Sequence, residues 1–253
     1  MKELTVFNTL LVGWFALAVV VFIALYFVVA PYGRHFRGGW GHAIGNKIGW
    51  IIMEAPAPVI FAVCFVSGND TRTIPLFVFL ALWEAHYIHR AFIYPFGLRG
   101  VARQMPLLVM GFAILFNGVN GYLNGRYIFA FSGGYPNAWL GDLRFIAGLA
   151  LFITGYIINR QSDRVLRSLR QPGESGYKIA NSGFYQWVSC PNYLGEIIIW
   201  TGWAVMTWSL AGLAFAFWTA ANLVPRARAH HAWYREYFPD YPPERKAMVP
   251  GLW

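Results

Sequence analysis

The first 30 residues contain the feature that most limits how this chain can fold. No charged side chain occurs between Val6 and Ala30, a run of 25 residues. About 20 apolar residues in a helix are enough to cross the hydrocarbon core of a bilayer. The run is followed by the letters PYGR rather than by a small-residue cleavage pattern. We therefore predict a retained transmembrane helix and not a signal peptide.

The rest of the chain shares this apolar character. Hydrophobic residues make up 57% of the 253 residues and charged residues only 12%, against about 25% charged residues in soluble domains. This composition argues against nucleic acid as a partner, although the net charge is +9. We expect a multi-pass integral membrane protein, in the bacterial inner membrane if the chain is prokaryotic or in the endoplasmic reticulum if it is eukaryotic.

Seven apolar stretches predict an all-α bundle of seven transmembrane helices. They lie at about 6–30, 50–66, 74–94, 105–123, 143–158, 193–208 and 210–224. The loops on one side of this arrangement contain fifteen Lys and Arg residues, and those on the other side contain four. By the positive-inside rule the N-terminus is outside and the C-terminus is cytosolic. A six-helix arrangement with the last two stretches fused as a re-entrant hairpin is the alternative.

Glu54 lies inside the apolar stretch GWIIMEAPAPVIF, residues 49–61. An ionisable group within the membrane is costly and is therefore a functional candidate. Burial disfavours the ionised form, and a neutral carboxylic acid can donate a hydrogen bond to an oxygen that gains negative charge during a reaction. The alternative is a structural acid that pairs with a His or Arg of another helix.

The third stretch contains the letters WEAHYIHRAFIYPF. Glu84, Tyr87 and Tyr94 follow helical spacing and are expected on one face. Tyr87 lies deep in the stretch and offers a second hydrogen-bond donor. Arg90 and Tyr94 are expected to anchor the helix at the membrane interface. No Cys, His and Asp spacing completes a metal-ligand set.

Two further patterns lie in the second half of the chain. In SCPNYLGEIIIW, Asn192 and Glu196 stand one turn apart near a helix start, where Glu196 is either an acid favoured by the helix dipole or an acceptor for a cofactor. Arg226, His230 and Tyr234 repeat at spacing four, which predicts one helical face. A solvated face or a face on lipid headgroups would give the same pattern. The basic loops 159–192 and 225–253 can enclose a polyphosphate.

These motifs together resemble the steroid 5α-reductase (3-oxo-5α-steroid 4-dehydrogenase) family, in its bacterial type. The resemblance covers nearly the whole chain and is strongest through LGDLRF, NRQSDRVLRSLRQPGESGYKI, NYLGEIIIWTGWAVMTWSLAGLAFAFW and HHAWYREYFPDYPPERKAMVPGLW. It implies a seven-helix membrane enzyme that reduces the Δ4 double bond of 3-oxo steroids with NADPH. The product would be the 5α-dihydro steroid.

The resemblance also implies a role for individual residues. Glu54 and Tyr87 would polarise the 3-keto oxygen of the substrate. The cofactor positions would be Trp50, Asn159, Asp163, Arg170, Tyr177, Asn192, Glu196, Arg226, His230 and Tyr234. We expect one membrane domain over 1–253, with the carbonyl-binding residues in 1–141 and the NADPH-binding part in 142–253, and a monomer in contact with membrane lipid.

Departures from the family pattern leave other activities open. Met53 stands where eukaryotic members often carry Gln, and Leu98 and Val101 stand where some members have Asn and Arg. The alternatives are reduction of another conjugated alkene, such as an enoyl-CoA or a sterol ring double bond, and S-adenosylmethionine-dependent methyl transfer. A transporter is a further alternative, but the chain lacks the internal symmetry that many transporters show.

Overall fold

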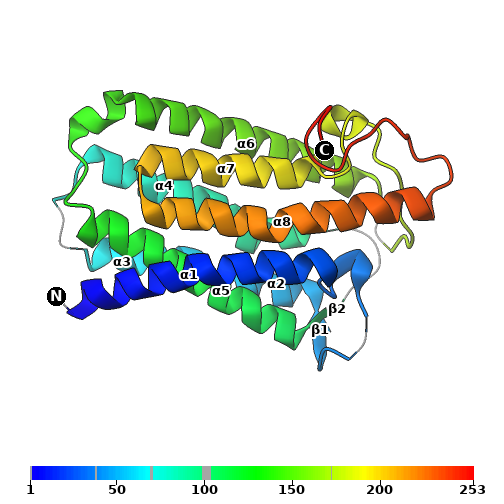
Figure 1. The fold of residues 1–253 in the computed structure, drawn as a ribbon, viewed down its shortest axis with the longest axis horizontal. Helices are drawn as coiled ribbons and strands as arrows, with labels where there is room; N and C mark the ends of the chain where they lie inside the picture. The colour runs from blue at the N-terminus through cyan, green and yellow to red at the C-terminus, as the bar shows by residue number, and fades with distance from the viewer. Residues whose placement is uncertain (1, 38, 69–70, 99–103, 172) are drawn as a thin grey trace. The chain divides into compact units, whose positions relative to one another are not determined.

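The computed structural model describes residues 2–37, 39–68, 71–98, 104–171 and 173–253, and helices dominate it (Figure 1). Arg99 and Arg103, which entered the charge count, and Val101 lie outside the described residues. The chain divides into two compact units, residues 1–11 with 31–145 (unit 1) and residues 12–30 with 146–253 (unit 2).

Unit 1 is built mainly from short helices and helix pairs. Its elements are η1 (Gly33–His35), β1 (Ala43–Gly45), α2 (Asn46–Glu54), α3 (Pro56–Val66), α4 (Ile74–Ile88), the π-helical turn η2 (His89–Ile93), η3 (Tyr94–Gly97), β2 (Gln104–Pro106), α5 (Leu107–Arg126), the π-helical turn η4 (Tyr127–Phe131) and η5 (Asn137–Gly141). The two strands pair antiparallel, with Ala43 opposite Pro106. In the core, Phe61 of α3 stacks on Trp83 of α4 with ring centroids 4.4 Å apart.

Unit 2 contains most of α6 (Leu143–Ser168), η6 (Gly183–Gln186), α7 (Pro191–Thr207) and α8 (Leu210–Tyr237). Within this unit α7 and α8 run side by side, and the C-terminal segment curls back over the start of α7 (Figure 1). Trp200 of α7 packs on Phe215 of α8 with ring centroids 4.1 Å apart. Helix α1 (Lys2–Phe27) contributes residues to both units.

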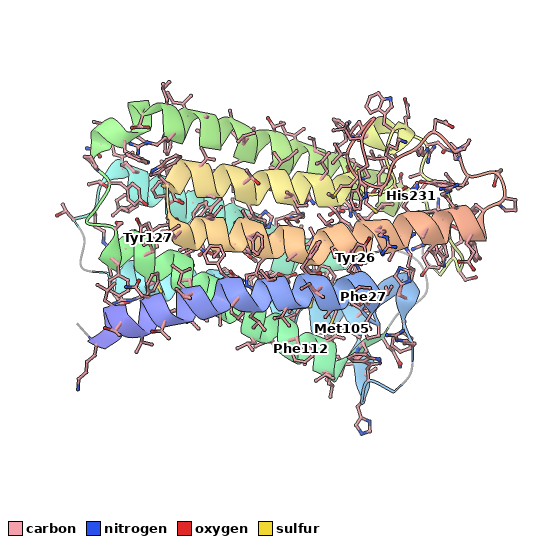
Figure 2. The ribbon with its side chains drawn as sticks, viewed as in Figure 1. Tyr26, Phe27, Met105, Phe112, Tyr127 and His231 are labelled. Carbon is pink, nitrogen blue, oxygen red and sulfur yellow. The ribbon has the colours of Figure 1, made fainter. Side chains whose placement is uncertain are left out.

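Five helical segments of the described chain are long and apolar enough to cross a membrane. They are Lys2–Phe27, Asn46–Val66, Ile74–Gly97, Leu107–Phe131 and Leu143–Ser168, and they correspond to the first five predicted stretches. Large apolar side chains also face outward: Phe27 is 79% exposed and Phe112 is 60% exposed (Figure 2). The fold is therefore an all-α fold of the integral membrane type.

The sixth and seventh predicted stretches are helical but differ from the other five. Helix α7 has only 17 residues, and α8 continues from its apolar half into a basic half that reaches Tyr237. The count of seven spans and the orientation in the membrane stay predictions. Helix α6 also runs on to Ser168, ten residues beyond the apolar stretch 143–158 that predicted it.

The motif MEAPAP determines where α2 ends. Proline has no backbone N–H, so Pro56 and Pro58 cannot donate helical hydrogen bonds to the carbonyl groups of Ile52 and Glu54. Helix α2 ends at Glu54, and α3 begins at Pro56, where a proline at the first position is favourable. The acid therefore lies at a break between two helices rather than within a continuous one.

Glycine residues bring α6 and α7 into backbone contact. A Cβ atom added at Gly155 would lie 2.6 Å from the carbonyl oxygen of Gly195, and one at Gly195 would lie 2.6 Å from the backbone nitrogen of Asn159. Gly148 and Gly202 form an equivalent contact along the same pair of helices. Small residues of this kind allow close packing of membrane helices, and here they bring Asn159 within reach of α7.

Candidate active site

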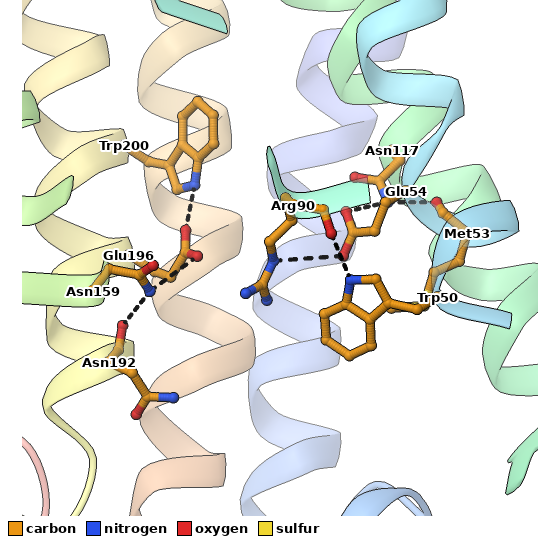
Figure 3. Close-up of polar contacts among 9 residues, drawn as sticks. All are labelled: Trp50, Met53, Glu54, Arg90, Asn117, Asn159, Asn192, Glu196 and Trp200. Carbon is orange, nitrogen blue, oxygen red and sulfur yellow. Dashed lines mark hydrogen bonds and ion pairs between the residues drawn. The ribbon is translucent and has the colours of Figure 1, made fainter. Parts of the chain in front are cut away.

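The carboxyl group of Glu54 contacts the side chains of Arg90 and Asn117 in unit 1. The residue is only 8% exposed. Nε of Arg90 lies 3.8 Å from Oε1, and Nδ2 of Asn117 donates a hydrogen bond to Oε2 at 3.2 Å (Figure 3). The alternative interpretation of Glu54, a structural acid, predicted an ion pair with a His or Arg, and Arg90 forms such a pair.

Arg90 is held by Trp50 and Tyr94. Nε1 of Trp50 donates a hydrogen bond to the backbone oxygen of Arg90 at 3.0 Å. The guanidinium carbon lies 4.9 Å from the Trp50 ring centroid and 5.3 Å from that of Tyr94. Arg90 was expected as an interface anchor, but the structure makes it a partner of Glu54. The π-helical turn His89–Ile93, a feature often found at functional sites, carries it there.

Tyr87 is a buried residue of α4, one turn before Arg90. Its ring packs against Trp83, with centroids 5.0 Å apart, and edge-on against His86 at 5.1 Å. Tyr87 was expected to lie deep in its apolar stretch, and the structure buries it. Tyr94 lies beyond the π-helical turn, is only half-buried and packs on Trp50 with ring centroids 5.2 Å apart.

In unit 2, Glu196 is held at both of its carboxyl oxygens. Nδ2 of Asn159 donates to Oε1 at 3.2 Å, and Nε1 of Trp200 donates to Oε2 at 3.2 Å (Figure 3). The same Asn159 nitrogen donates to the backbone oxygen of Asn192 at 3.0 Å. Glu196 is buried, so its carboxyl group is fixed by these hydrogen bonds near the start of α7.

The residues Arg226, His230 and Tyr234 form one buried face of α8. This confirms the predicted helical face and excludes the solvated alternative for these three side chains. Nε of Arg226 donates to the Tyr193 hydroxyl at 3.1 Å, and that hydroxyl lies 3.5 Å from Nδ1 of His230. Tyr193 therefore links the arginine to the histidine, a role that the sequence did not indicate.

A second aromatic and basic group involves Arg170 and Tyr177. Nε of Arg170 donates to the backbone oxygen of Gly176 at 2.9 Å, and its guanidinium carbon lies 4.8 Å from the Tyr177 ring centroid. The Tyr177 ring packs edge-on against Trp233 of α8 at 4.8 Å. This arrangement fixes the loop that follows α6 to the end of α8.

Asp163 and Tyr185 are buried in the same unit. The Tyr185 hydroxyl has no hydrogen-bond partner among the residues that the structure describes. Burial, followed by the charge of Asp163, raises the pKa of Tyr185 well above its usual value. A buried hydroxyl in a neutral form is thus available as a donor near this aspartate.

The C-terminal segment is tied to the start of α7 through Ser189. Its Oγ lies 2.6 Å from Nδ1 of His231 and 2.7 Å from the Tyr241 hydroxyl. The backbone N–H of Ser189 donates a hydrogen bond to the backbone oxygen of Lys246 at 2.9 Å. His231 lies on α8 near the curled segment (Figure 2). Burial, with Arg235 and Lys246 as smaller causes, lowers the pKa of His231 below its usual value.

Asn117, Arg90, Tyr193 and Trp200 were not among the predicted site residues. For Asn117 a signal was present, because FNGVNGYLNG places three asparagines on one face of a largely apolar helix. Among the predicted residues, Trp50 and Glu54 share the neighbour Arg90 in unit 1. Asn159, Asn192 and Glu196 form one hydrogen-bonded group in unit 2.

Comparison with known proteins gives consistent matches along the chain. The family described as 3-oxo-5-alpha-steroid 4-dehydrogenase matches residues 103–253. The chain is 41% identical to "Steroid 5-alpha-reductase DET2" of Gossypium hirsutum, over 100% of this chain and 99% of the cotton protein. It is 40% identical to "3-oxo-5-alpha-steroid 4-dehydrogenase 1" of Bos taurus (94% and 93% covered) and 41% identical to that of Homo sapiens (87% and 85% covered).

Proposed function

The chain belongs to the 3-oxo-5-alpha-steroid 4-dehydrogenase family, and from that membership we propose that it reduces the Δ4 double bond of a 3-oxo steroid to the 5α-dihydro product with NADPH. It is an oxidoreductase of the steroid 5α-reductase type. The observation that carries this proposal is the 41% identity to a steroid 5-alpha-reductase over the whole length of both chains.

The residues of unit 2 fit a phosphorylated dinucleotide by their chemistry. Arg170 and Arg226 offer cations for phosphate groups, and the ring of Tyr177 beside Arg170 offers a stacking surface for a base. Asn192 and Glu196 offer groups that can bind ribose hydroxyls or an amide. We propose that these residues, with Asn159, Asp163, His230 and Tyr234, hold the cofactor; Trp50 stays a cofactor position that the family resemblance predicts.

When bound, NADPH supplies the hydride that adds to the β-carbon of the enone. Negative charge then develops on the 3-keto oxygen as the enolate forms. We propose that Glu54, in its neutral form, and Tyr87 donate hydrogen bonds to that oxygen. Donors placed where charge develops in a dry site are among the largest contributions to catalysis. The α-carbon finally takes a proton from water, which completes reduction of the double bond.

Arg90 has a defined place in this proposal. Its Nε lies 3.8 Å from Oε1 of Glu54, and its guanidinium is held by two aromatic rings. A permanent cation at this distance adds positive potential where the carbonyl oxygen gains charge. Arg90 also lies beside Oε1, the carboxyl oxygen proposed to donate to the substrate. A substrate carbonyl must therefore enter between Arg90 and Oε1 or contact both groups. The affinity of the site for a carbonyl therefore depends on both residues.

The experiment that tests the proposal uses the full chain in detergent. The purified protein is incubated with NADPH and either testosterone or progesterone, and the product is identified by mass and stereochemistry. A 5α-dihydro product that requires NADPH supports the proposal. Turnover of an enoyl-CoA alone, or a rise in thermal midpoint with S-adenosylmethionine and not with NADPH, would contradict it.

A further inference from the structure

Asn117 is a buried side chain of α5 that donates a hydrogen bond to Glu54. It is 3% exposed. Its Nδ2 donates to the backbone oxygen of Met53 at 2.7 Å and to Oε2 of Glu54 at 3.2 Å (Figure 3). An amide nitrogen carries two hydrogens, so one can serve the backbone and the other the carboxyl group.

The position of these two acceptors follows from the helix break in MEAPAP. Helix α2 ends at Glu54, and the carbonyl groups of its last turn need partners from outside the helix. Asn117 supplies one for Met53. The same nitrogen then reaches the carboxyl group of the next residue, so the side chain of Glu54 is fixed relative to its own backbone. An apolar residue at position 117 would do neither.

The contact also distinguishes the two carboxyl oxygens of Glu54. In a neutral carboxylic acid the carbonyl oxygen is a better acceptor than the hydroxyl oxygen. Asn117 donates a hydrogen bond to Oε2 at 3.2 Å, whereas Nε of Arg90 lies 3.8 Å from Oε1, beyond hydrogen-bond distance. This difference favours the arrangement in which Oε1 carries the proton. Oε1 is the oxygen that lies beside Nε of Arg90.

We propose that Asn117 is a positioning residue for the reaction: by holding Oε2 of Glu54 as an acceptor, it presents Oε1 as the hydrogen-bond donor to the substrate carbonyl. This inference rests on the proposed role of Glu54. Asn117 acts through Glu54 and needs no contact of its own with substrate or cofactor. Its removal leaves the acid free to rotate, and a misplaced catalytic group typically costs about 100-fold in rate.

Helix α5 supplies its own matched control. Asn124 is also fully buried, and its Nδ2 donates to the backbone oxygen of Asn120 at 3.0 Å, one turn earlier in the same helix. Asn124→Ala therefore removes a buried amide from the same helix without removing the contact to Glu54. A purely structural role for Asn117 predicts that Asn117→Ala and Asn124→Ala behave alike.

The test is a double-mutant cycle on the full-length protein in detergent with NADPH and a Δ4-3-keto steroid. The proteins are wild type, Asn117→Ala, Glu54→Gln and the double variant, with Asn124→Ala as the control. We expect Asn117→Ala to lower kcat about 10- to 100-fold with an unchanged Kd for NADPH. In the Glu54→Gln background the same change should have less than about a twofold effect, because residues that act as a unit are not additive.

Asn117→Asp extends the test if the alanine variant folds poorly. Aspartate has nearly the same shape, and only its neutral form can donate a hydrogen bond. The rate of this variant relative to wild type should therefore recover as the pH is lowered. A merely structural substitution would show the same ratio at every pH.

The outcomes separate this inference from the proposed function. Suppose that Glu54→Gln is nearly inactive and that Asn117→Ala lowers kcat in this background as much as it does in wild type. This result overturns the positioning role alone. Equal kcat values for Asn117→Ala and Asn124→Ala also overturn it. A Glu54→Gln protein with the wild-type rate overturns the positioning role together with the proposed role of Glu54.

Discussion

Nε of Arg90 lies 3.8 Å from Oε1 of Glu54, so the acid at the end of α2 faces a permanent cation from the segment that follows α4. The two residues are 36 positions apart in the chain, and a proline-induced helix break and a π-helical turn bring them together. A neutral Glu54 donates to a substrate carbonyl, whereas an ionised Glu54 only accepts hydrogen bonds, as from Asn117, and pairs with the Arg90 cation. Substitution of the acid distinguishes these states.

Glu54→Gln should lower kcat for enone reduction about 100- to 1000-fold, because an amide N–H is a much weaker donor to a developing oxyanion than a carboxylic acid O–H. The glutamine oxygen would take the place of Oε2 beside Asn117, and its NH₂ group would meet the Arg90 cation. Binding of NADPH, followed by fluorescence or calorimetry, should stay nearly unchanged. Glu3→Gln is the control, since Glu3 is an exposed acid of unit 1 paired with Arg126. An unchanged rate for Glu54→Gln would refute the role proposed for this acid.

Arg170→Ala and Asn192→Ala should weaken NADPH binding before they affect the steroid. Asn192 contributes its backbone oxygen to the bond with Asn159, so truncation of its side chain leaves that bond intact. We expect a rise of about tenfold in the Kd for NADPH, which is the effect of about 1.4 kcal/mol. Arg164→Ala removes the same charge as Arg170→Ala from an exposed position of α6 and serves as the control. A rise in the steroid KM alone would contradict the assignment.

Gly155→Ala should destabilise unit 2. The added Cβ would lie 2.6 Å from the Gly195 carbonyl oxygen and 2.6 Å from the Ile199 nitrogen, and backbone atoms of a packed helix cannot move aside cheaply. Overpacking of this kind typically costs about 1–3 kcal/mol. The thermal midpoint in detergent measures it. Gly111→Ala is the matched helical control, because a Cβ at Gly111 of α5 meets no atom within 4 Å; its midpoint should stay level or rise slightly.

Lowering the pH should loosen the attachment of the C-terminal segment. The folded pKa of His231 is below its usual value, so the unfolded chain binds a proton at a higher pH than the folded chain does. Stability is then complete above the ordinary histidine pKa of about 6.5 and falls as the pH drops from there to the folded value. Thermal midpoints measured across this window should fall less in His231→Gln than in wild type. Equal slopes would show that His231 does not contribute.

The sequence predicted the position of Glu54 better than its surroundings. The apolar letters around residue 54 were enough to predict burial, and the spacing of Arg226, His230 and Tyr234 was enough to predict one buried helical face. The partners of Glu54 were not predictable in this way. Arg90 was interpreted as an interface anchor, because ideal helical spacing contains no information about a π-helical turn at His89–Ile93.

The sequence also did not predict where two of the helices end. Hydropathy placed the fifth and seventh stretches at 143–158 and 210–224, where the apolar residues stop. The helices α6 and α8 continue to Ser168 and Tyr237, because their polar ends pack within unit 2 and a backbone helix does not end where polarity changes. Pro225 does not end α8 either, since local proline preference can be overridden by packing around it.

Because α8 is continuous, the rotation of its apolar half about the helix axis also determines the rotation of its polar half. Each residue of a helix turns it by about 100°. Deleting a single residue from the apolar half, between Leu210 and Val224, would therefore swing Arg226, His230 and Tyr234 together out of the interior of unit 2 while their spacing stayed intact. The packing of the apolar half of α8 therefore determines which way the polar side chains of its second half face.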